Sequence, residues 1–257
     1  MAKKKSKSID VPTEAVELMA GYKDEEEVVH TEAQVREITG VDEEAIAKGD
    51  VRSNVGRIVT ILLAGCTVKI GSLERENISS NKWEGIFRNM YLGDRDLLLL
   101  KISEYTNGPE MSVKSRCPSC KTDLTVDFNS EELEIKPLEC NPDNIPFELP
   151  KGFIGDDGER IKQGVLRLPN GFDQEQLDTV ARKNPGTANT MLITRCVKEL
   201  GDLGLSSNTF RSLSIKDREY LVNVLSENSF GPKFMIDAIC DNCGHDFETG
   251  VNPINFI

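Results

Sequence analysis

Two stretches of 43 residues in this chain of 257 residues are similar to each other and align without a gap. Residues Phe87–Asn129 and Phe210–Asn252 lie 123 positions apart and share 13 identical residues. The identities fall on cysteine, glycine-proline and charged positions, among them Phe87/Phe210, Arg88/Arg211, Asp94/Asp217, Arg95/Arg218, Leu98/Leu221, Gly108/Gly231, Pro109/Pro232, Cys117/Cys240, Cys120/Cys243 and Asp123/Asp246. Self-similarity at one fixed spacing predicts that a single structural unit has been duplicated.

The similarity continues upstream with small shifts in spacing. It pairs Arg36 with Arg167, the segment Gly40–Asp42 with Gly171–Asp173, and Cys66 with Cys196. We therefore predict a first repeat unit over residues 35–136 and a second over residues 164–257. Residues 137–163 contain four prolines and a Gly-Asp-Asp-Gly stretch, so they predict an irregular linker between the units.

Residues 1–34 precede the first unit and predict an acidic, mobile arm. Lysines crowd the first eight positions, whereas residues 9–50 carry 13 acidic and 3 basic side chains. A short helix is expected around Thr13–Ala20, with Pro12 near its start and Gly21 just past its end. The arm could be a solvated tail or a peptide that becomes ordered on a partner, and the sequence leaves both open.

Both units are expected to run in the same order: a strand, a short helix capped by aspartate, an apolar helix, a third helix, and a β-hairpin with Cys-x-x-Cys at its turn. In the first unit these are residues 31–38, a helix at Asp42, Gly56–Cys66, and a helix from Asp94 to Gly108. In the second they are residues 164–169, a helix at Asp173, Ala188–Leu200, and a helix from Asp217 to Gly231. This order predicts an α+β fold whose two copies are related by a pseudo-twofold axis.

Four of the seven cysteines form two Cys-x-x-Cys pairs, Cys117/Cys120 and Cys240/Cys243. Two thiolates two residues apart on a tight turn can both bind one Zn²⁺ at about 2.3 Å. A tetrahedral structural site needs four ligands, and each pair supplies two. We therefore predict one structural zinc ion shared by Cys117, Cys120, Cys240 and Cys243, which would clamp the two units together.

Two other interpretations of these cysteines stay open at this point. A thiol oxidoreductase places its first cysteine at the N-terminus of a helix, whereas a period-two strand pattern follows the first pair here, at Leu124, Val126 and Phe128. The cysteines could also be a vestigial site without metal. His245 has no equivalent in the first unit, where Thr122 stands, so we expect it on the surface.

Catalytic motifs are missing from the sequence. With two histidines, no phosphate-binding loop and no nucleophile motif, we expect that the protein is not an enzyme. The repeated Asp-Arg pairs favour a helix-capping aspartate followed by a structural arginine over a catalytic carboxylate. Cys66 and Cys196 are expected in the core, whereas the sequence assigns no role to Cys140 and leaves Trp83 as either a core residue or an interface anchor.

The net charge of −12, from 31 basic and 43 acidic residues, disfavours general binding to nucleic acid. Membrane insertion is not expected, because no apolar stretch approaches the roughly 20 residues that a span requires. Residues Met1–Ser8 are lysine-rich but no apolar segment follows them, so a secretory signal is not expected either. These features place the protein in a cytoplasm.

Several of these motifs together resemble the T-even-type baseplate hub assembly chaperone family of contractile-tailed bacteriophages and related contractile injection systems. The resemblance rests on an apolar helix that ends in cysteine, the Gly-Asp-Arg-Asp-Leu-Leu-Leu-Leu run at 93–100, and the Gly-Pro and Cys-Pro-x-Cys hairpin that follow. The segment 166–173 is similar to the family's Leu-Pro-Thr-Gly-x-Asp stretch, although Asn170 stands where the family has threonine. The resemblance as a whole covers roughly residues 35–252 and carries over no catalytic residue.

The resemblance implies a non-enzymatic phage tail protein, either a baseplate hub assembly chaperone or a minor hub component. Its partners would be baseplate hub or tape-measure proteins, and it would act in the cytoplasm of the infected bacterium or remain in the virion baseplate. The alternatives from other classes are a zinc-ribbon-like nucleic-acid-binding protein and a Cys-x-x-Cys thiol oxidoreductase. The sequence does not define an oligomeric state.

Overall fold

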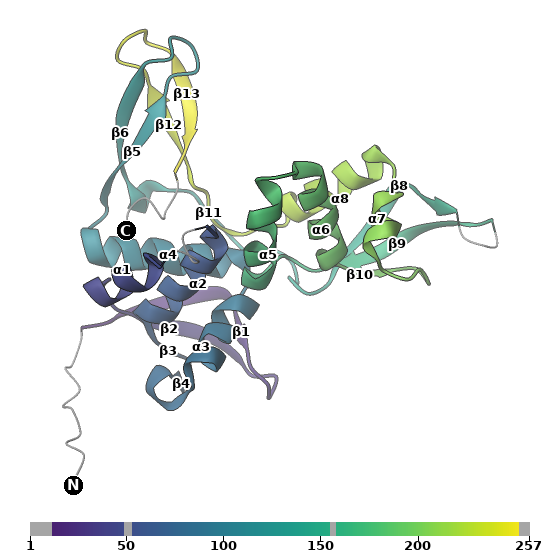
Figure 1. Ribbon diagram of the computed structural model, residues 1–257, viewed down its shortest axis with the longest axis horizontal. Helices are drawn as coiled ribbons and strands as arrows, with labels where there is room; N and C mark the ends of the chain where they lie inside the picture. The colour runs from purple at the N-terminus through teal and green to yellow at the C-terminus, as the bar shows by residue number, and fades with distance from the viewer. Residues whose placement is uncertain (1–11, 49–52, 155–157, 252–257) are drawn as a thin grey trace.

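The computed structural model describes residues 12–48, 53–154 and 158–251. Two lobes lie side by side, and a stalk made of two β-hairpins rises from the first lobe (Figure 1). Each lobe has its own cluster of buried apolar side chains. Helices and antiparallel strands occur in both lobes, so the predicted α+β class is confirmed.

The first lobe packs its helices against a four-stranded antiparallel sheet with the order β1-β2-β3-β4. Its elements are β1 (Glu14–Lys23), β2 (Val29–Val35), α1 (Gly40–Ile46), α2 (Val55–Cys66), β3 (Thr67–Ile70), β4 (Leu73–Glu74), the short 3-10 helix η1 (Arg75–Asn77), α3 (Ser80–Asn89) and α4 (Leu92–Asn107).

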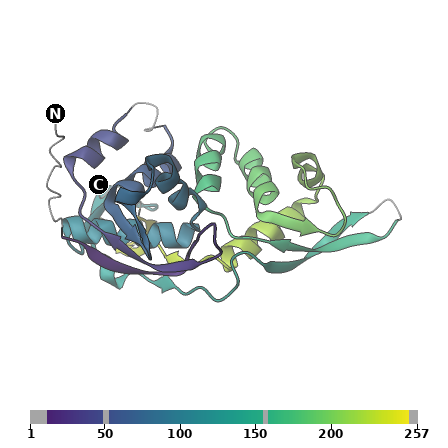
Figure 2. The same ribbon diagram turned by 90° about the horizontal axis from the view of Figure 1, so that it is seen from below.

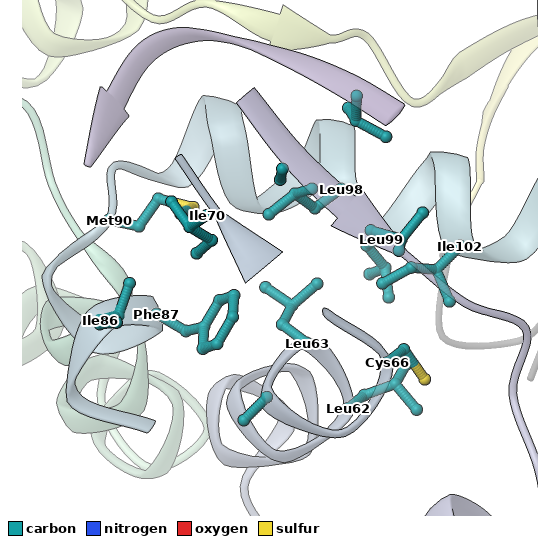
Figure 3. Packing of buried hydrophobic residues seen from close by; sticks show 14 of the residues in the cluster. Leu62, Leu63, Cys66, Ile70, Ile86, Phe87, Met90, Leu98, Leu99 and Ile102 are labelled. Carbon is teal, nitrogen blue, oxygen red and sulfur yellow. The ribbon is translucent and has the colours of Figure 1, made fainter. Parts of the chain in front are cut away.

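Helix α4 is the centre of the first lobe, because its apolar side chains occupy nearly its whole circumference. The run 97–100 is buried, and Figure 3 shows Leu98, Leu99 and Ile102 of this helix facing Leu63 of α2. Trp83 of α3 is also buried, and its indole N–H donates to the carbonyl oxygen of Ala64 at 3.1 Å. Trp83 is therefore a core residue.

The acidic arm predicted for residues 1–34 is wrong from Glu14 onward, and so is the helix around Thr13–Ala20. The strands β1 and β2 occupy this region, and Val16 and Leu18 point into the core. The alternation of these apolar residues was concealed by the acidic residues on the opposite, exposed face of the strand. Residues 1–11 lie outside the described part of the chain.

The buried carboxylate of Asp94 in α4 fixes β1 in place. It accepts hydrogen bonds from the backbone N–H groups of Met19 (2.7 Å), Ala20 (3.1 Å) and Gly21 (2.9 Å). The predicted helix cap at Asp94 is thus wrong, since Tyr91 is the N-cap of α4. A carboxylate that binds three amides of another element acts as a tertiary link.

The second lobe packs its helices against a three-stranded antiparallel sheet with the order β10-β9-β8. Its elements are β8 (Ile145–Ile154), β9 (Arg160–Leu166), α5 (Gly171–Ala181), α6 (Pro185–Cys196), β10 (Val197–Leu200), α7 (Ser207–Arg211) and α8 (Ile215–Glu227).

Two predictions for the second lobe need correction. The irregular linker at 137–163 contains β8 and the start of β9, because the prolines at 146 and 150 stand in a strand that alternates buried Phe147 and Leu149 with exposed residues. The apolar helix ends at Cys196 rather than at Leu200, and residues 197–200 continue as β10. The predicted strands at 31–38 and 164–169 are confirmed as strands that begin and end a few residues earlier.

The short helices α1 and α5 begin one turn before the predicted aspartate caps. Their N-caps are Thr39 and Asn170, while Asp42 and Asp173 occupy the third helical position and accept from the N-cap backbone N–H. Each aspartate also receives two hydrogen bonds from the arginine that directly follows the preceding strand: Arg36 binds Asp42 at 2.8 and 2.9 Å, and Arg167 binds Asp173 at 2.6 and 3.1 Å. Burial opposes ionisation, but these bonds hold the pKa of both carboxyls below its usual value.

The stalk consists of the hairpins β5–β6 and β12–β13, which follow α4 and α8. Their strands are β5 (Glu110–Arg116), β6 (Asp123–Asn129), β12 (Met235–Ile239) and β13 (Asp246–Gly250). Short segments join the stalk to the lobes, namely η2 (Ser130–Glu132), β7 (Ile135–Lys136) and β11 (Gly231–Pro232), of which β7 and β11 pair. The second hairpin thereby returns to the first lobe and stands beside the first hairpin (Figure 1). Within the described ranges, no helix is both long enough and apolar enough to cross a membrane.

Asp94→Ala is expected to lower the free energy of unfolding by about 3 kcal/mol, because three buried N–H groups lose their acceptor. The matched control is Asp217→Ala, since Asp217 accepts one backbone N–H from the described residues of a strand, that of Lys151 at 2.7 Å. Urea denaturation and hydrogen exchange check this. Exchange at residues 19–21 should accelerate in the first variant alone, and equal losses in both variants would contradict the assignment.

Candidate metal centre

The four cysteines of the two Cys-x-x-Cys pairs meet at the tip of the stalk. Cys117 and Cys120 lie in the β5–β6 turn, and Cys240 and Cys243 lie in the β12–β13 turn. Their sulfur atoms all lie within 4.8 Å of one another. Cys117 and Cys240 are buried, Cys120 is half-buried and Cys243 is exposed. The sequence-predicted set of ligands is thus assembled in one place.

The two turns have the same hydrogen-bond pattern. The N–H of Cys117 donates to the carbonyl of Thr122 at 3.0 Å, and the N–H of Cys240 donates to the carbonyl of His245 at 2.9 Å. The residue after each second cysteine has a positive φ, 63° at Lys121 and 67° at Gly244. This left-handed conformation costs little for glycine but is strained for lysine. Lys121 offsets the strain in part, because its ammonium donates to the carbonyl of Pro118 at 2.7 Å.

The sulfur spacing fits a tetrahedral metal site. Sγ of Cys117 lies 3.8 Å from that of Cys243, and Sγ of Cys120 lies 3.6 Å from that of Cys240. Four thiolates at about 2.3 Å from one ion would be about 3.8 Å apart, by tetrahedral geometry. Disulfide sulfurs are bonded at about 2.0 Å. The observed distances therefore match shared coordination and leave all four cysteines unbonded to one another.

The local hydrogen bonds favour a thiolate at one of the four positions. The side chain and backbone of Thr122, with Asn242, lower the pKa of Cys120 to about 5. The backbone N–H of His245 also favours ionisation of Cys243, but the neighbouring thiols raise its pKa to about 11. Four negative charges in so small a volume repel one another strongly. A bound cation removes this conflict, because it is attracted to every thiolate at once.

Few other contacts join the two hairpins. The hydroxyls of Ser115 and Thr249 lie 2.7 Å apart, and the amide of Asn242 donates to the hydroxyl of Thr122 at 3.2 Å. A two-stranded hairpin has little stability alone in water. A metal ion at the tip would consequently contribute a large share of the stability of the stalk. Thr122 and Asn242 support the site at positions that the spacing of the cysteines did not reveal.

The geometry disfavours the oxidoreductase interpretation. Strands β6 and β13 follow the two pairs, so neither first cysteine lies at the N-terminus of a helix that could lower its pKa. His245 is exposed and stacks on Phe247, as expected for a surface residue. It is not a member of the four-sulfur cluster.

The remaining cysteines lie elsewhere. Cys66 and Cys196 are fully buried at the ends of α2 and α6, where burial raises the pKa of both thiols to about 12, and the prediction of core residues is confirmed. Cys140 is half-buried against the apolar cluster of the second lobe, and its Sγ lies 4.0 Å from the carbonyl oxygen of Asn228. Nothing in its surroundings assigns it a functional role.

Purified protein is expected to bind one thiophilic divalent metal ion per chain, which elemental analysis and titration with Co²⁺ would measure. Cys117→Ser should reduce this stoichiometry to near zero, because three sulfur ligands hold the ion far less tightly. Cys140→Ser is the matched control and should retain one ion. Two ions per chain would contradict a shared site, and none in the unmodified protein would contradict a metal site altogether.

Comparison with known protein families gives a match. The sequence matches the family described as the T4 bacteriophage base plate protein over residues 19–205, which include both lobes up to the loop before α7 and the first Cys-x-x-Cys pair. No curated protein matches, and no solved structure does. The family match spans well over half of the chain. The chain therefore belongs to the T4 bacteriophage base plate protein family.

Proposed function

We propose that this baseplate-family protein is a non-enzymatic hub assembly chaperone or minor hub component that acts through contacts with baseplate hub or tape-measure proteins. Membership of the baseplate family carries this proposal, because it places the chain among proteins of the phage tail. The resemblance of the helix at 93–100 and of the hairpin after it to hub assembly chaperones supports the hub as the part of the baseplate where the protein acts. The protein would work in the cytoplasm of the infected bacterium and could stay in the finished baseplate.

The contacts of the two histidines support a role in binding over one in catalysis. His30 is buried, and its Nε2 lies 2.8 Å from a carboxylate oxygen of Asp24. Asp24 also accepts the backbone N–H groups of Glu26 and Val28 within the β1–β2 turn. This pair is therefore occupied in holding a hairpin turn. His245, the other histidine, is far from it at the tip of the stalk.

The metal in this proposal is Zn²⁺. Four thiolates without a histidine or carboxylate suit a soft, tetrahedral ion, and Zn²⁺ has no redox chemistry of its own. When bound, the ion supplies structural cross-linking. Cys117, Cys120, Cys240 and Cys243 would hold it between the two hairpins.

We also propose that the two lobes and their hairpins are copies of one duplicated unit. Supporting this, the aspartate-arginine pairs at 42/36 and 173/167 make the same contacts, and both arginines donate their backbone N–H to the terminal cysteine carbonyl of the apolar helix at 2.8 Å. The first cysteine of each pair approaches the second of the other, as a pseudo-twofold axis through the metal requires. That axis would relate the hairpins alone, because the lobes meet through unlike surfaces.

Removal of zinc by a strong chelator is expected to lower the free energy of unfolding by at least about 2 kcal/mol, since the ion binds the folded form alone. Thermal unfolding with and without chelator measures this. Cys117→Ser should start from the lower stability and respond little to chelator. Equal responses of both proteins would mean that the chelator acts at another site.

Co-expression with the baseplate proteins of the same phage tests the function. The chain is expected to co-purify with a hub or tape-measure protein, and phage lacking it should accumulate incomplete baseplates. Mass spectrometry of purified virions then separates the two roles, because a chaperone is absent from them and a hub component is present. Normal baseplates without the chain, together with no co-purifying tail protein, would refute the proposal.

A further inference from the structure

The first lobe contacts the second through a surface that a small set of polar contacts around Arg95 holds in place. The Arg95 guanidinium is fully buried and donates to the carbonyl of Phe87 (2.5 Å), to the carbonyl of Gly56 and to the hydroxyl of Thr60 (both 3.2 Å). These bonds tie α2, α3 and α4 together. They also shape a face, here called the α2–α4 face, onto which the start of α5 docks.

Helix α5 approaches this face very closely. Gly171 has no room for a Cβ atom, which would lie 2.3 Å from Nη1 of Arg95 and 2.6 Å from the carbonyl oxygen of Phe87. A Cβ on Gly56, across the contact, would lie 2.7 Å from the backbone nitrogen of Glu175. The two glycines are therefore required by the contact between the lobes.

Charged and polar side chains complete the contact. Arg95 donates to Gln174 at 3.2 Å, while the buried Glu175 accepts from the hydroxyl of Thr60 at 2.6 Å and from Nε of Arg88 at 3.1 Å. Two backbone hydrogen bonds complete the edge of the contact. The N–H of Gly171 donates to the carbonyl of Met90 at 3.0 Å, and the N–H of Leu92 donates to the carbonyl of Pro169 at 3.2 Å.

The second lobe carries the same face. The Arg218 guanidinium donates to the carbonyl of Phe210 (2.8 Å), to that of Gly186 (3.3 Å) and to the hydroxyl of Thr190 (2.8 Å). These partners occupy the places of Phe87, Gly56 and Thr60 around Arg95. Yet Arg218 is half-exposed and Arg211, at the place of Arg88, is exposed. No described segment of the chain docks on this α6–α8 face as α5 docks on the first lobe.

Helix α1 of the first lobe is the counterpart of α5, the helix that docks on the α2–α4 face. Its first residue, Gly40, corresponds to Gly171, but a Cβ there would meet nothing within 4 Å. Glu43 and Glu44 stand at the places of Gln174 and Glu175 and are exposed. Their negative charges are complementary to the positive charges of Arg218 and Arg211 on the α6–α8 face.

One pair of residues that differs between the two lobes also supports the match between α1 and the α6–α8 face. The backbone N–H of Val55 donates to the carboxylate of Asp178 at 2.9 Å in the contact between the lobes. The corresponding residues are Pro185, which has no N–H, and Ala47, which has no carboxylate. Donor and acceptor are thus both missing from the two free surfaces, so neither would be left buried without a partner.

We propose that a second copy of this chain docks the start of its α1 helix onto the α6–α8 face, so that chains join head to tail. Figures 1 and 2 show α1 in the first lobe and the helices α6–α8 in the second, with α5 between them, so one chain does not bring its own two surfaces together. The occupant is a second copy because its α1 offers both the small residue and the acidic pair that this face requires. The contact is heterologous and produces a ring or a filament.

The purified full chain is expected to self-associate in sedimentation velocity as its concentration rises from micromolar to near-millimolar. Gly40→Leu blocks the docking element without crowding its own lobe, and Arg211→Glu reverses the charge of the face; each should weaken association by at least about tenfold. Gly85→Ala is the control, because a Cβ on this glycine of α3 meets nothing within 4 Å, and it should associate like the unmodified chain.

Mixing the two blocked variants identifies the arrangement. Gly40→Leu retains a free α6–α8 face and Arg211→Glu retains a free α1, so an equal mixture should form a dimer that does not grow further. Glu44→Arg combined with Arg211→Glu in one chain should restore association that either change alone weakens. A chain that stays monomeric throughout, or association that neither block affects, overturns the proposal. The proposed role at the hub is tested separately with tail proteins.

Discussion

The buried guanidinium of Arg95 determines how the two lobes meet. A charged group without contact to water is costly unless it is hydrogen-bonded. The two terminal nitrogens of Arg95 donate to carbonyl and hydroxyl oxygens from α2 and α3 and to the side chain of Gln174 from α5, whereas its Nε is buried without an acceptor among the described residues. Burial lowers its pKa to about 10, so it is still charged at neutral pH. Because its donors reach into the second lobe, the position of α5 is fixed by the same group that holds the first lobe together.

The position of the lobes in turn makes the four-sulfur cluster possible. The second hairpin starts from α8 in the second lobe and must return to the first lobe, guided by the β7–β11 pairing and by Phe230, which packs on Gly93. Only then do Cys240 and Cys243 reach Cys117 and Cys120. A metal ion bound at this point would close a loop of more than a hundred residues, and closure of a long loop removes much conformational freedom from the unfolded chain.

Much of the candidate site could be predicted from the sequence, because the ligands come in pairs whose spacing alone specifies the turn. The Cys-x-x-Cys hairpins and the Gly-Pro end of α4 appear where the self-alignment put them, whereas α8 ends at Glu227, before Gly231 and Pro232, which form β11 instead. The sequence does not reveal strand β1, because the acidic residues on its exposed face obscure the alternation of Val16 and Leu18. The anchoring role of Asp94 was also missed, since its partners are backbone amides more than seventy residues away and leave no side-chain signal.

The residues identical between the two halves are informative beyond the fold. Arginine and phenylalanine recur at 87/210, 88/211 and 95/218, yet in the first lobe these positions serve the contact with α5. If they served only the interior of each lobe, the exposed Arg211 would have no reason to match Arg88. In the head-to-tail arrangement α1 of one chain covers the α6–α8 face of the next, as α5 covers the α2–α4 face within each chain, so the recurring arginines serve equivalent contacts.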